Sequence, residues 1–330
     1  MTTSQTILTT AIETWPLATA FNISRGAKTQ AQVVVATLEN GDHKGRGECV
    51  PYARYGETLD EVAETIRSVA PDIANGLTRA DLQLLLPPGA ARNALDCAFW
   101  DLEAKSTGTR VWELAKCGTP NTLTTAFSLS LDTPEKMGAA AAAAATRPIL
   151  KIKLGGTGDE ARIAAIHKAA PNARLIVDAN EGWTPETLAP NAEAMARYGV
   201  ALIEQPLPAD QDSLLRDYNT PVPFCADESC HGIASLARLV GLYDMVNIKL
   251  DKTGGLTEAL ATARAARDIG FSIMVGCMVG TSLGMAPAML VAKSNDIVDL
   301  DGPLLLTKDR SPGIIYRGSE MSPVGPDVWG

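Results

Sequence analysis

Apolar, strand-like segments recur about every 25 residues from residue 124 onward, separated by helical patterns, as in successive βα units. Their C-terminal ends fall near Ser130, Lys153, Asn180, Gln205, Glu228, Leu250, Cys277 and Leu300. Amphipathic patterns between them predict helices, for example over 160–170, 184–198 and 256–269. Eight strands at this spacing predict a modified (β/α)₈ barrel of the TIM type. A doubly wound open sheet is the alternative, but it usually has fewer strands.

The N-terminal part of the chain lacks this repeat and predicts a separate α+β domain. Strands are expected over 7–13, 32–38 and 45–51, and helices over 58–73 and 90–105. An Asn-Gly pair at residues 40 and 41 predicts a hairpin turn between the second and third strands. We therefore expect a capping domain over 1–118, joined by the C-terminal segment 310–330, and a catalytic barrel over 119–309.

Three of the predicted barrel strands end at or next to an acidic residue: Asp178, Glu204 and Asp227. Because the C-terminal ends of parallel strands lie on one face of a barrel, these carboxylates should converge. A single acid there would more often cap a helix or pair with a lysine. Three together favour a metal site, since clustered like charges are costly without a cation. Hard oxygen ligands favour Mg²⁺, with Mn²⁺ as the other candidate, and Asn180 and Glu228 would support the site.

Two lysines flank the acidic residues, Lys153 one unit before them and Lys249 one unit after them. Both should point into the barrel mouth and act as bases on either side of the metal. Lys151 alternates with Ile152 and so shares a face with Lys153. The positive charges of Lys151 and the metal would favour the neutral amine of Lys153, which is the form that a base requires. Lys252 competes with Lys249 for the second role but lies in the following turn, and surface lysines at strand ends are the structural alternative.

Composition narrows the class of protein further. The net charge of −9 argues against a nucleic-acid surface. The six cysteines form no Cys-x-x-Cys pair, which favours reduced thiols in a cytoplasmic protein. The first residues lack the pattern of a signal peptide, and the Ala-rich run over 138–146 is too short to span a membrane. Neither a nucleic-acid partner nor a membrane partner is therefore expected.

Several short motifs resemble those of the enolase superfamily. The Lys-Ile-Lys motif at 151–153, the three acidic residues and the Asn-Ile-Lys-Leu-Asp-Lys-Thr-Gly-Gly segment at 247–255 are similar to the muconate-lactonizing subgroup. Each motif is weak alone, but their order and spacing together are specific, and the resemblance covers essentially the whole chain. It implies a capped barrel in which Mg²⁺ stabilises an enediolate and lysines move the proton.

Within that subgroup, the Asp-x-Asp pattern at Asp299 and Asp301 resembles dipeptide epimerases, where it holds the α-ammonium group of the substrate. A turn-forming pair of aspartates before Gly302 is the structural alternative. The segment around Arg25 resembles the mobile loop of L-Ala-D/L-Glu epimerases, where an arginine meets the glutamate side chain. The resemblance thus implies epimerisation of L-Ala-D/L-Glu and related dipeptides by two-base 1,1-proton transfer, in murein peptide metabolism.

Other functions remain open at this point. Within the subgroup, an N-acylamino acid racemase, an o-succinylbenzoate synthase or a cycloisomerase would share the metal site and the lysines. A non-catalytic ligand-binding barrel is the alternative from a different class, although it would not need two lysines on opposite faces. The expected partner is a small dipeptide, and the sequence leaves open whether the chain forms a homo-oligomer.

Overall fold

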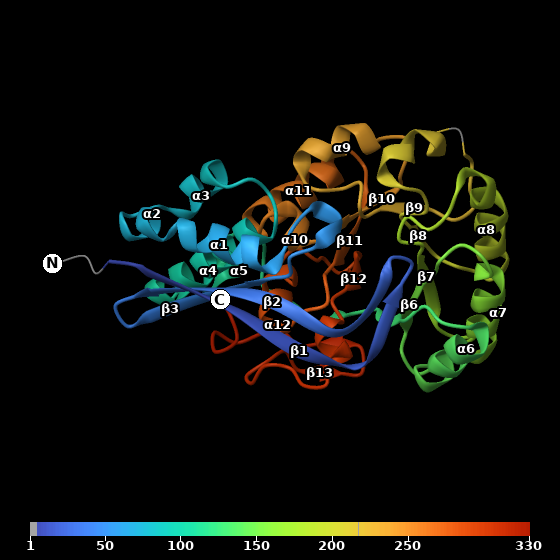
Figure 1. Cartoon of the computed structure of the whole chain (residues 1–330), viewed down its shortest axis with the longest axis horizontal. Helices are drawn as coiled ribbons and strands as arrows, with labels where there is room; N and C mark the ends of the chain where they lie inside the picture. The colour runs from blue at the N-terminus through green and yellow to red at the C-terminus, as the bar shows by residue number, and fades with distance from the viewer. Residues whose placement is uncertain (1–4, 217) are drawn as a thin grey trace.

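The computed structural model describes residues 5–216 and 218–330, and it contains a barrel with a smaller domain beside it (Figure 1). Eight parallel strands follow one another around the barrel in chain order. They are β5 (Phe127–Leu129), β6 (Ile149–Lys153), β7 (Arg174–Asp178), β8 (Ile203–Glu204), β9 (Phe224–Ala226), β10 (Met245–Ile248), β11 (Ser272–Gly276) and β12 (Ile297–Asp299). A parallel bridge between Thr125 and Val298 closes the barrel. The predicted barrel is therefore confirmed.

Helices follow the barrel strands, and most of them cover the outside of the barrel. They are α6 (Pro134–Ala143), α7 (Asp159–Ala169), α8 (Pro185–Arg197), α9 (Ile233–Leu239), α10 (Leu250–Thr253), α11 (Leu256–Asp268) and α12 (Ser282–Ala288). Two connections are shorter 3₁₀ helices, η2 (Ala209–Leu215) after β8 and η3 (Gly302–Leu305) after β12. In α6, Thr133 accepts a hydrogen bond from the amide of Lys136, and Pro134 occupies the first turn, where its missing N–H costs nothing. At η2 and η3, a short 3₁₀ helix takes the place of the α-helix of a regular (β/α)₈ barrel, so the barrel is modified there.

Apolar side chains fill the lower part of the barrel interior and fix which way the strand ends face. Ile176 and Met274 belong to a small buried cluster inside the barrel. Side chains two residues apart on a strand share a face, so Asp178 points to the same interior as Ile176. The same alternation places Lys151 and Lys153 together. The apolar floor therefore orients the polar residues at the C-terminal mouth.

The smaller domain contains a three-stranded antiparallel sheet and a set of helices. Its elements are β1 (Ile7–Ile23), β2 (Gly26–Asn40), β3 (His43–Cys49), η1 (Ala53–Tyr55), α1 (Leu59–Ser68), α2 (Ala70–Ala74), α3 (Arg79–Leu85), α4 (Ala90–Thr107) and α5 (Val111–Leu114). This confirms the predicted α+β cap. The helix expected over 58–73 is divided at Val69, just before Pro71, which lacks an amide donor.

The first two strands are longer than predicted and form a hairpin that reaches across to the barrel (Figure 1). Their pairing shifts in register between Pro16 and Phe21, where proline cannot donate to the ladder. Leu17 bridges to Leu306, which ties the bent hairpin to the segment after the eighth barrel strand. The segment that resembles a mobile loop therefore lies at the tip of this hairpin, with Arg25 in its turn.

The cap sheet packs closely on α4 because two glycines of β3 face that helix. A Cβ on Gly47 would lie 2.0 Å from the carbonyl oxygen of Ala94, and one on Gly45 would lie 2.3 Å from that of Ala98. Gly47→Ala should therefore lower the free energy of unfolding by at least about 2 kcal/mol, since backbone atoms must move to admit the methyl group. Urea unfolding measures this. Lys44→Ala, exposed on the same strand, is the control, and equal stability of both variants would contradict the packing argument.

The C-terminal segment folds back onto α4. Earlier in this segment the chain adds two short strands to a small three-stranded sheet. Its strands are β4 (Leu123–Thr124), β13 (Tyr316–Arg317) and β14 (Glu320–Met321). The indole N–H of Trp329 donates to the carbonyl of Cys97 at 3.1 Å, and the amide of Gly330 donates to Asp101 at 2.7 Å. No described helix combines the length and the apolar character needed to cross a membrane.

Candidate active site

Three carboxylates meet at the C-terminal mouth of the barrel, on adjacent strands. Asp178 ends β7, Glu204 ends β8 and is in register with it, and Asp227 directly follows β9. One oxygen of each lies within 4.8 Å of the others, and all three residues are buried. Burial and the neighbouring Asp178 raise the pKa of Glu204 to about 7. Hard, buried oxygen donors at this separation fit a divalent cation such as Mg²⁺.

Two lysines of β6 contact this cluster. The Nζ atom of Lys153 lies 2.6 Å from Asp178. The Nζ atom of Lys151 lies 2.7 Å from Glu204, 2.7 Å from Asp299 and 3.3 Å from Asp178. Burial alone would lower the pKa of Lys151, but these three carboxylates raise it well above its usual value. Lys151 is therefore a fixed positive charge within the cluster.

Two further lysines contact Asp227 from the segment after β10. Lys249 lies 2.6 Å from one carboxylate oxygen of Asp227, and Lys252 lies 2.6 Å from the other. Lys252 also donates to the carbonyl groups of Asp227 and Asn247, at 2.5 and 2.9 Å. Only Lys249 of this pair lines the cavity described below, as Lys153 does on the other side. The sequence did not reveal that Lys252 is buried against the cluster.

Polar residues inside the barrel hold the carboxylates in place. The side-chain amide of Asn247 donates to Glu204 at 2.7 Å, and a Cβ on Gly276 would lie 2.6 Å from the Asn247 side chain, so a larger residue at position 276 would displace that amide. Gln205 accepts hydrogen bonds from the amides of Asp227 and Ser229, at 3.0 and 3.2 Å. Sequence analysis missed both amides. The only available signals in the sequence were that Gln205 stands next to Glu204 and that Asn247 lies within an apolar strand.

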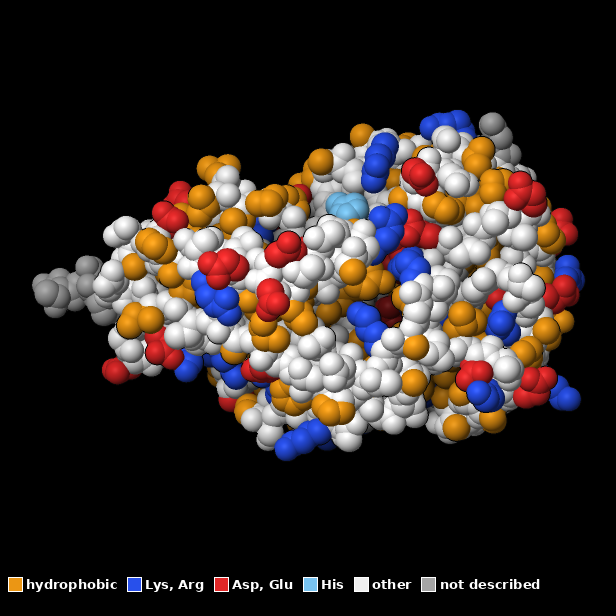
Figure 2. All heavy atoms as spheres, in the orientation of Figure 1, with side chains coloured by type: hydrophobic (Ala, Val, Ile, Leu, Met, Phe, Trp, Pro, Cys, Tyr) orange, Lys and Arg blue, Asp and Glu red, His pale blue; other side chains and the backbone are white. Residues whose placement is uncertain are grey.

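A cavity of about 460 Å³ lies between the mouth of the barrel and the cap. In Figure 2, Lys and Arg side chains surround a hollow on this face, and acidic atoms are visible deep inside it. The cap contributes the hairpin tip and the segment Tyr52–Tyr55, and the barrel contributes Asn180, Asp227 and Glu228. A buried side-chain oxygen of Asn180 and one of Glu228 have no hydrogen-bond partner among the described residues. The cavity therefore offers free acceptors next to the carboxylates.

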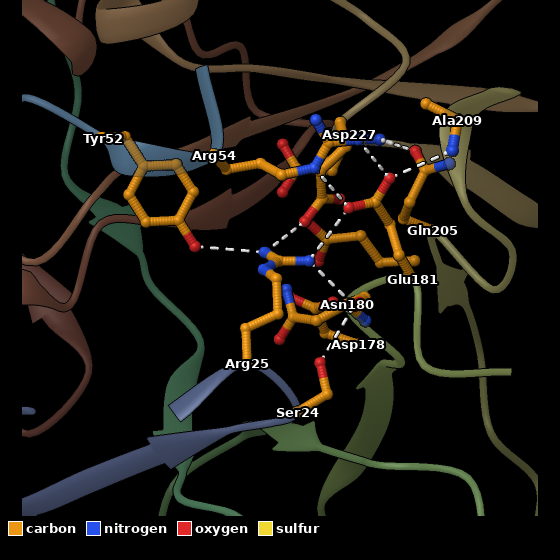
Figure 3. Close-up of polar contacts among 12 residues, drawn as sticks. Ser24, Arg25, Tyr52, Arg54, Asp178, Asn180, Glu181, Gln205, Ala209 and Asp227 are labelled. Atoms are coloured by element: carbon orange, nitrogen blue, oxygen red, sulfur yellow. Dashed lines mark hydrogen bonds and ion pairs between the residues drawn. The ribbon is translucent and has the colours of Figure 1, made fainter. Parts of the chain in front are cut away.

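The cap is tied to the barrel through Arg25 (Figure 3). One terminal nitrogen donates to the carbonyl of Asn180 at 2.8 Å and to Glu181 at 3.1 Å. The other donates to the hydroxyl of Tyr52 at 3.0 Å and to Glu228 at 2.6 Å. The hairpin tip is thus fastened over the cavity, with its arginine between the cap and two barrel loops.

Asp299 and Asp301 lie beside the cluster: Asp299 ends β12, and Asp301 is two residues further along the chain. Asp299 is bonded to Lys151, and its other carboxylate oxygen has no hydrogen-bond partner among the described residues. Asp301 accepts a hydrogen bond from the amide of Ser128 at 2.6 Å, and burial together with Asp299 raises its pKa to about 7. Both are buried and neither lines the cavity. Their predicted contact with an ammonium group stays a prediction.

Family models match both parts of the chain. Residues 5–115 match the mandelate racemase / muconate lactonizing enzyme N-terminal domain, and residues 136–299 match the enolase C-terminal domain-like family. The chain belongs to the enolase superfamily. The resemblance to the enolase superfamily, inferred from the Lys-Ile-Lys motif and the three strand-end acids, is therefore confirmed.

Two relatives cover nearly the whole chain. One is an L-Ala-D/L-Glu epimerase of Escherichia coli K12, 48% identical over 94% of this chain and 97% of its own length. The other is an N-acetyl-D-glutamate racemase of a Pseudoalteromonas species, 46% identical over 90% of this chain and 95% of its own length. Both are named as enzymes that invert a stereocentre, and this chain is an isomerase.

Solved structures show the same architecture. An enolase family member from Agrobacterium tumefaciens with homology to dipeptide epimerases has a TM-score of 0.97 and 51% identity, over 98% of this chain and all of that one. It is described with bound sodium, L-Ala-L-Glu and an ordered loop. A dipeptide epimerase from Enterococcus faecalis V583, complexed with Mg and L-Leu-L-Tyr, has a TM-score of 0.89 and 29% identity, over 98% of each chain.

Proposed function

We propose that this enzyme epimerises dipeptides of the L-Ala-D/L-Glu type by moving the α-proton of the second residue between Lys153 and Lys249. The observation that carries this proposal is the placement of the two lysines. Lys153 ends β6 and Lys249 follows β10, four strands further around an eight-stranded barrel. Strands four positions apart lie on opposite walls, so the two amines approach the cavity from opposite sides.

The three carboxylates between the lysines are the proposed ligands of a divalent cation, Mg²⁺ or Mn²⁺. When bound, such a cation stabilises negative charge on the substrate carboxylate as the neighbouring C–H bond breaks. Lys151 holds a positive charge against Asp178 and Glu204, and Asn247 fixes the orientation of Glu204.

Each lysine then has one role on one face of the α-carbon. A neutral amine on one side takes the proton, and the ammonium group on the other side returns a proton to the opposite face. The centre is inverted because the two groups cannot reach the same face. Asp299 and Asp301 are the proposed partners of the α-ammonium group on the first residue, and Asn180 and Glu228 contribute the free oxygens near the cluster.

The proposal is tested by incubating the enzyme and Mg²⁺ with L-Ala-L-Glu in deuterated water and following the α-proton of glutamate by NMR. Loss of that signal, with formation of L-Ala-D-Glu, is the expected result. The N-acetylated dipeptide and L-Ala-L-Leu serve as comparison substrates. An enzyme that exchanges none of these α-protons would contradict the proposal and would favour a ligand-binding barrel.

A second candidate is racemisation of N-acylated glutamate, which has no free ammonium group. The observation that favours it is the burial of Asp299 and Asp301 outside the cavity lining. One of the two relatives described above is also named for this substrate class. Both candidates use the same acids and lysines, so recognition of the ammonium group separates them.

Asp301→Asn separates the two candidates. If Asp301 holds the ammonium group, the variant should lose more than about tenfold in kcat/KM for L-Ala-L-Glu, because a charge-assisted hydrogen bond is worth roughly 1.5–3 kcal/mol. N-acetylglutamate should be affected little in either case. Initial rates on both substrates measure this. Unchanged dipeptide turnover, or faster turnover of the acylated compound by the wild type, would favour the racemase.

The biological setting forms part of the same proposal. We propose that the enzyme acts in the cytoplasm on dipeptides released from murein. We also propose that residues 1–118 and 310–330 form one capping unit over the barrel at 119–309. The contacts of Trp329 and Gly330 with α4 support that division.

A further inference from the structure

Arg92, on α4 of the cap, is a buried cation, and no carboxylate among the described residues forms an ion pair with it. Its guanidinium group donates to backbone carbonyl groups instead. The Nε atom donates to Gly254 at 3.1 Å and one terminal nitrogen donates to Thr253 at 2.7 Å, both at the end of α10. The other terminal nitrogen donates to the carbonyls of Gln83 and Leu86, at the end of α3. Because the last carbonyl groups of a helix have no partner within it, Arg92 joins a helix end of the cap to a helix end of the barrel.

Asp96 stands one turn further along α4 and holds the next barrel helix, α11. Its carboxylate accepts hydrogen bonds from the amide of Thr257 at 2.9 Å and from the Thr257 hydroxyl at 2.6 Å. Thr257 lies in the first turn of α11, where Gly255 stands at the capping position and has no side-chain acceptor. A Cβ on Gly255 would lie 2.5 Å from Asp96. One on Gly254 would lie equally close to Arg92, so the turn between α10 and α11 lies directly against α4.

The helix that Arg92 holds, α10, is a single turn that begins beside Lys249. The carbonyl of Lys249 accepts hydrogen bonds from the amides of Lys252 and Thr253, both at 3.0 Å. The carbonyl of Thr253 in turn accepts the hydrogen bond from Arg92. One residue and two hydrogen bonds thus connect Arg92 to the backbone of Lys249. A shift at the far end of α10 would therefore move the lysine.

The two proposed bases differ in what supports their backbone. Lys153 lies within β6, in register with Asp178 on β7, so the barrel ladder holds it. Lys249 lies one residue beyond the end of β10 and so beyond the ladder. Figure 1 shows α10 and α11 on the side of the barrel next to the cap helices. Helix α4 thus supports Lys249, whereas strand pairing supports Lys153.

We propose that Arg92 is a positioning residue for the reaction: by holding the end of α10, it places the Lys249 amine against one face of the substrate α-carbon. This inference rests on the proposed function, in which Lys249 and Lys153 act on opposite faces. Arg92 does not line the cavity between the cap and the barrel, so it acts through Lys249. Misplacement of a reacting group by about 1 Å can cost about 10²-fold in rate. Loss of Arg92 should therefore slow the step at Lys249 and leave the step at Lys153 intact.

The test measures α-proton exchange of L-Ala-L-Glu and L-Ala-D-Glu in deuterated water when a single base remains. In Lys153→Ala the remaining base is Lys249, and in Lys249→Ala it is Lys153. Adding Arg92→Met should lower exchange at least tenfold, an effect of about 10¹ to 10², in the first background and change it by less than about twofold in the second. Adding Arg92→Lys instead should recover part of the loss, because an ammonium group can still donate to the carbonyl of Thr253.

Steady-state rates give a second measurement with both lysines present. Arg92→Met alone should lower kcat for L-Ala-L-Glu by about tenfold or more and change KM little, because Arg92 acts on a reacting group and not on binding. Lys105→Met is the matched control, since Lys105 lies on the same helix and pairs with Asp101 at 2.8 Å. It should change neither kcat nor the exchange rates.

Equal losses in the two single-lysine backgrounds would overturn the role of Arg92, because a general loss of structure affects both lysines. Unchanged kcat in Arg92→Met would overturn it as well, and this measurement decides the question where exchange in the single-lysine variants is too slow to follow. A wild type that exchanges no α-proton of these dipeptides would overturn it together with the proposed reaction. Wild-type exchange combined with either of the first two results overturns the role of Arg92 alone.

Discussion

Lys153→Ala and Lys249→Ala should each abolish epimerisation of L-Ala-L-Glu, with a loss of at least about 10² to 10⁴ in rate. Each variant lacks the group on one face of the α-carbon, so the proton cannot be both removed and returned with inversion. The remaining lysine can still act on its own face. We therefore expect each variant to exchange the α-proton of one epimer with solvent, and the two variants to differ in which epimer they exchange.

The measurement is α-proton exchange in deuterated water, starting from L-Ala-L-Glu and, separately, from L-Ala-D-Glu. The two variants serve as controls for each other, because a fold defect would remove exchange of both epimers. Circular dichroism shows whether each variant keeps the native structure. Epimerisation at the wild-type rate in either variant would contradict the two-base mechanism.

The positions of the strand-end residues could be predicted from sequence because two simple rules determine them. The repeat of strands and helices predicts where each strand ends, and alternation along a strand predicts which residues share a face. These rules placed Asp178, Glu204 and Lys153 at one mouth, where the structure has them. Asp227 and Lys249 follow short strands directly, and the same spacing located them.

The surroundings of the carboxylates could not be predicted in the same way. The sequence argument treated the three acids as lacking any other counter-charge, but Lys151, Lys153, Lys249 and Lys252 all lie within ion-pair distance of them. Lys252 belongs to a turn in the sequence, and its contact with Asp227 depends on how α10 folds back over the mouth. Such contacts between units have no signature in local periodicity.

The hairpin shows a second limit of local patterns. Residues 14–31 have no clear alternation of apolar and polar side chains, so only the ends of the two strands were predicted. In the structure, pairing continues to Ile23 and Gly26, and the contact between Leu17 and Leu306 directs the hairpin to the barrel. The placement of Arg25 over the cavity depends on this long-range contact.

Removal of the metal should abolish activity while leaving the protein folded. Chelation takes away the charge that stabilises the reacting carboxylate, so turnover should fall to background, and Mg²⁺ or Mn²⁺ should restore it. The fold should persist because four lysines still surround the three carboxylates, and no bare cluster of like charges remains. Activity assays with and without chelator, together with circular dichroism of the same samples, measure both parts. Full turnover by metal-free enzyme would contradict the assignment.

Glu204→Gln tests the same site without a chelator. The pKa of Glu204 is raised to about 7, so a neutral side chain should be tolerated there, but an amide is a much weaker ligand for a hard cation. We expect Mg²⁺ affinity to fall by at least about tenfold, with the thermal midpoint nearly unchanged. Asp251→Asn is the matched control, since Asp251 is also buried with its pKa raised to about 7 yet bonds to the amide of Val50 in the cap. Calorimetric titration with Mg²⁺ should show weaker binding only in Glu204→Gln, because only that carboxylate belongs to the cluster at the barrel mouth.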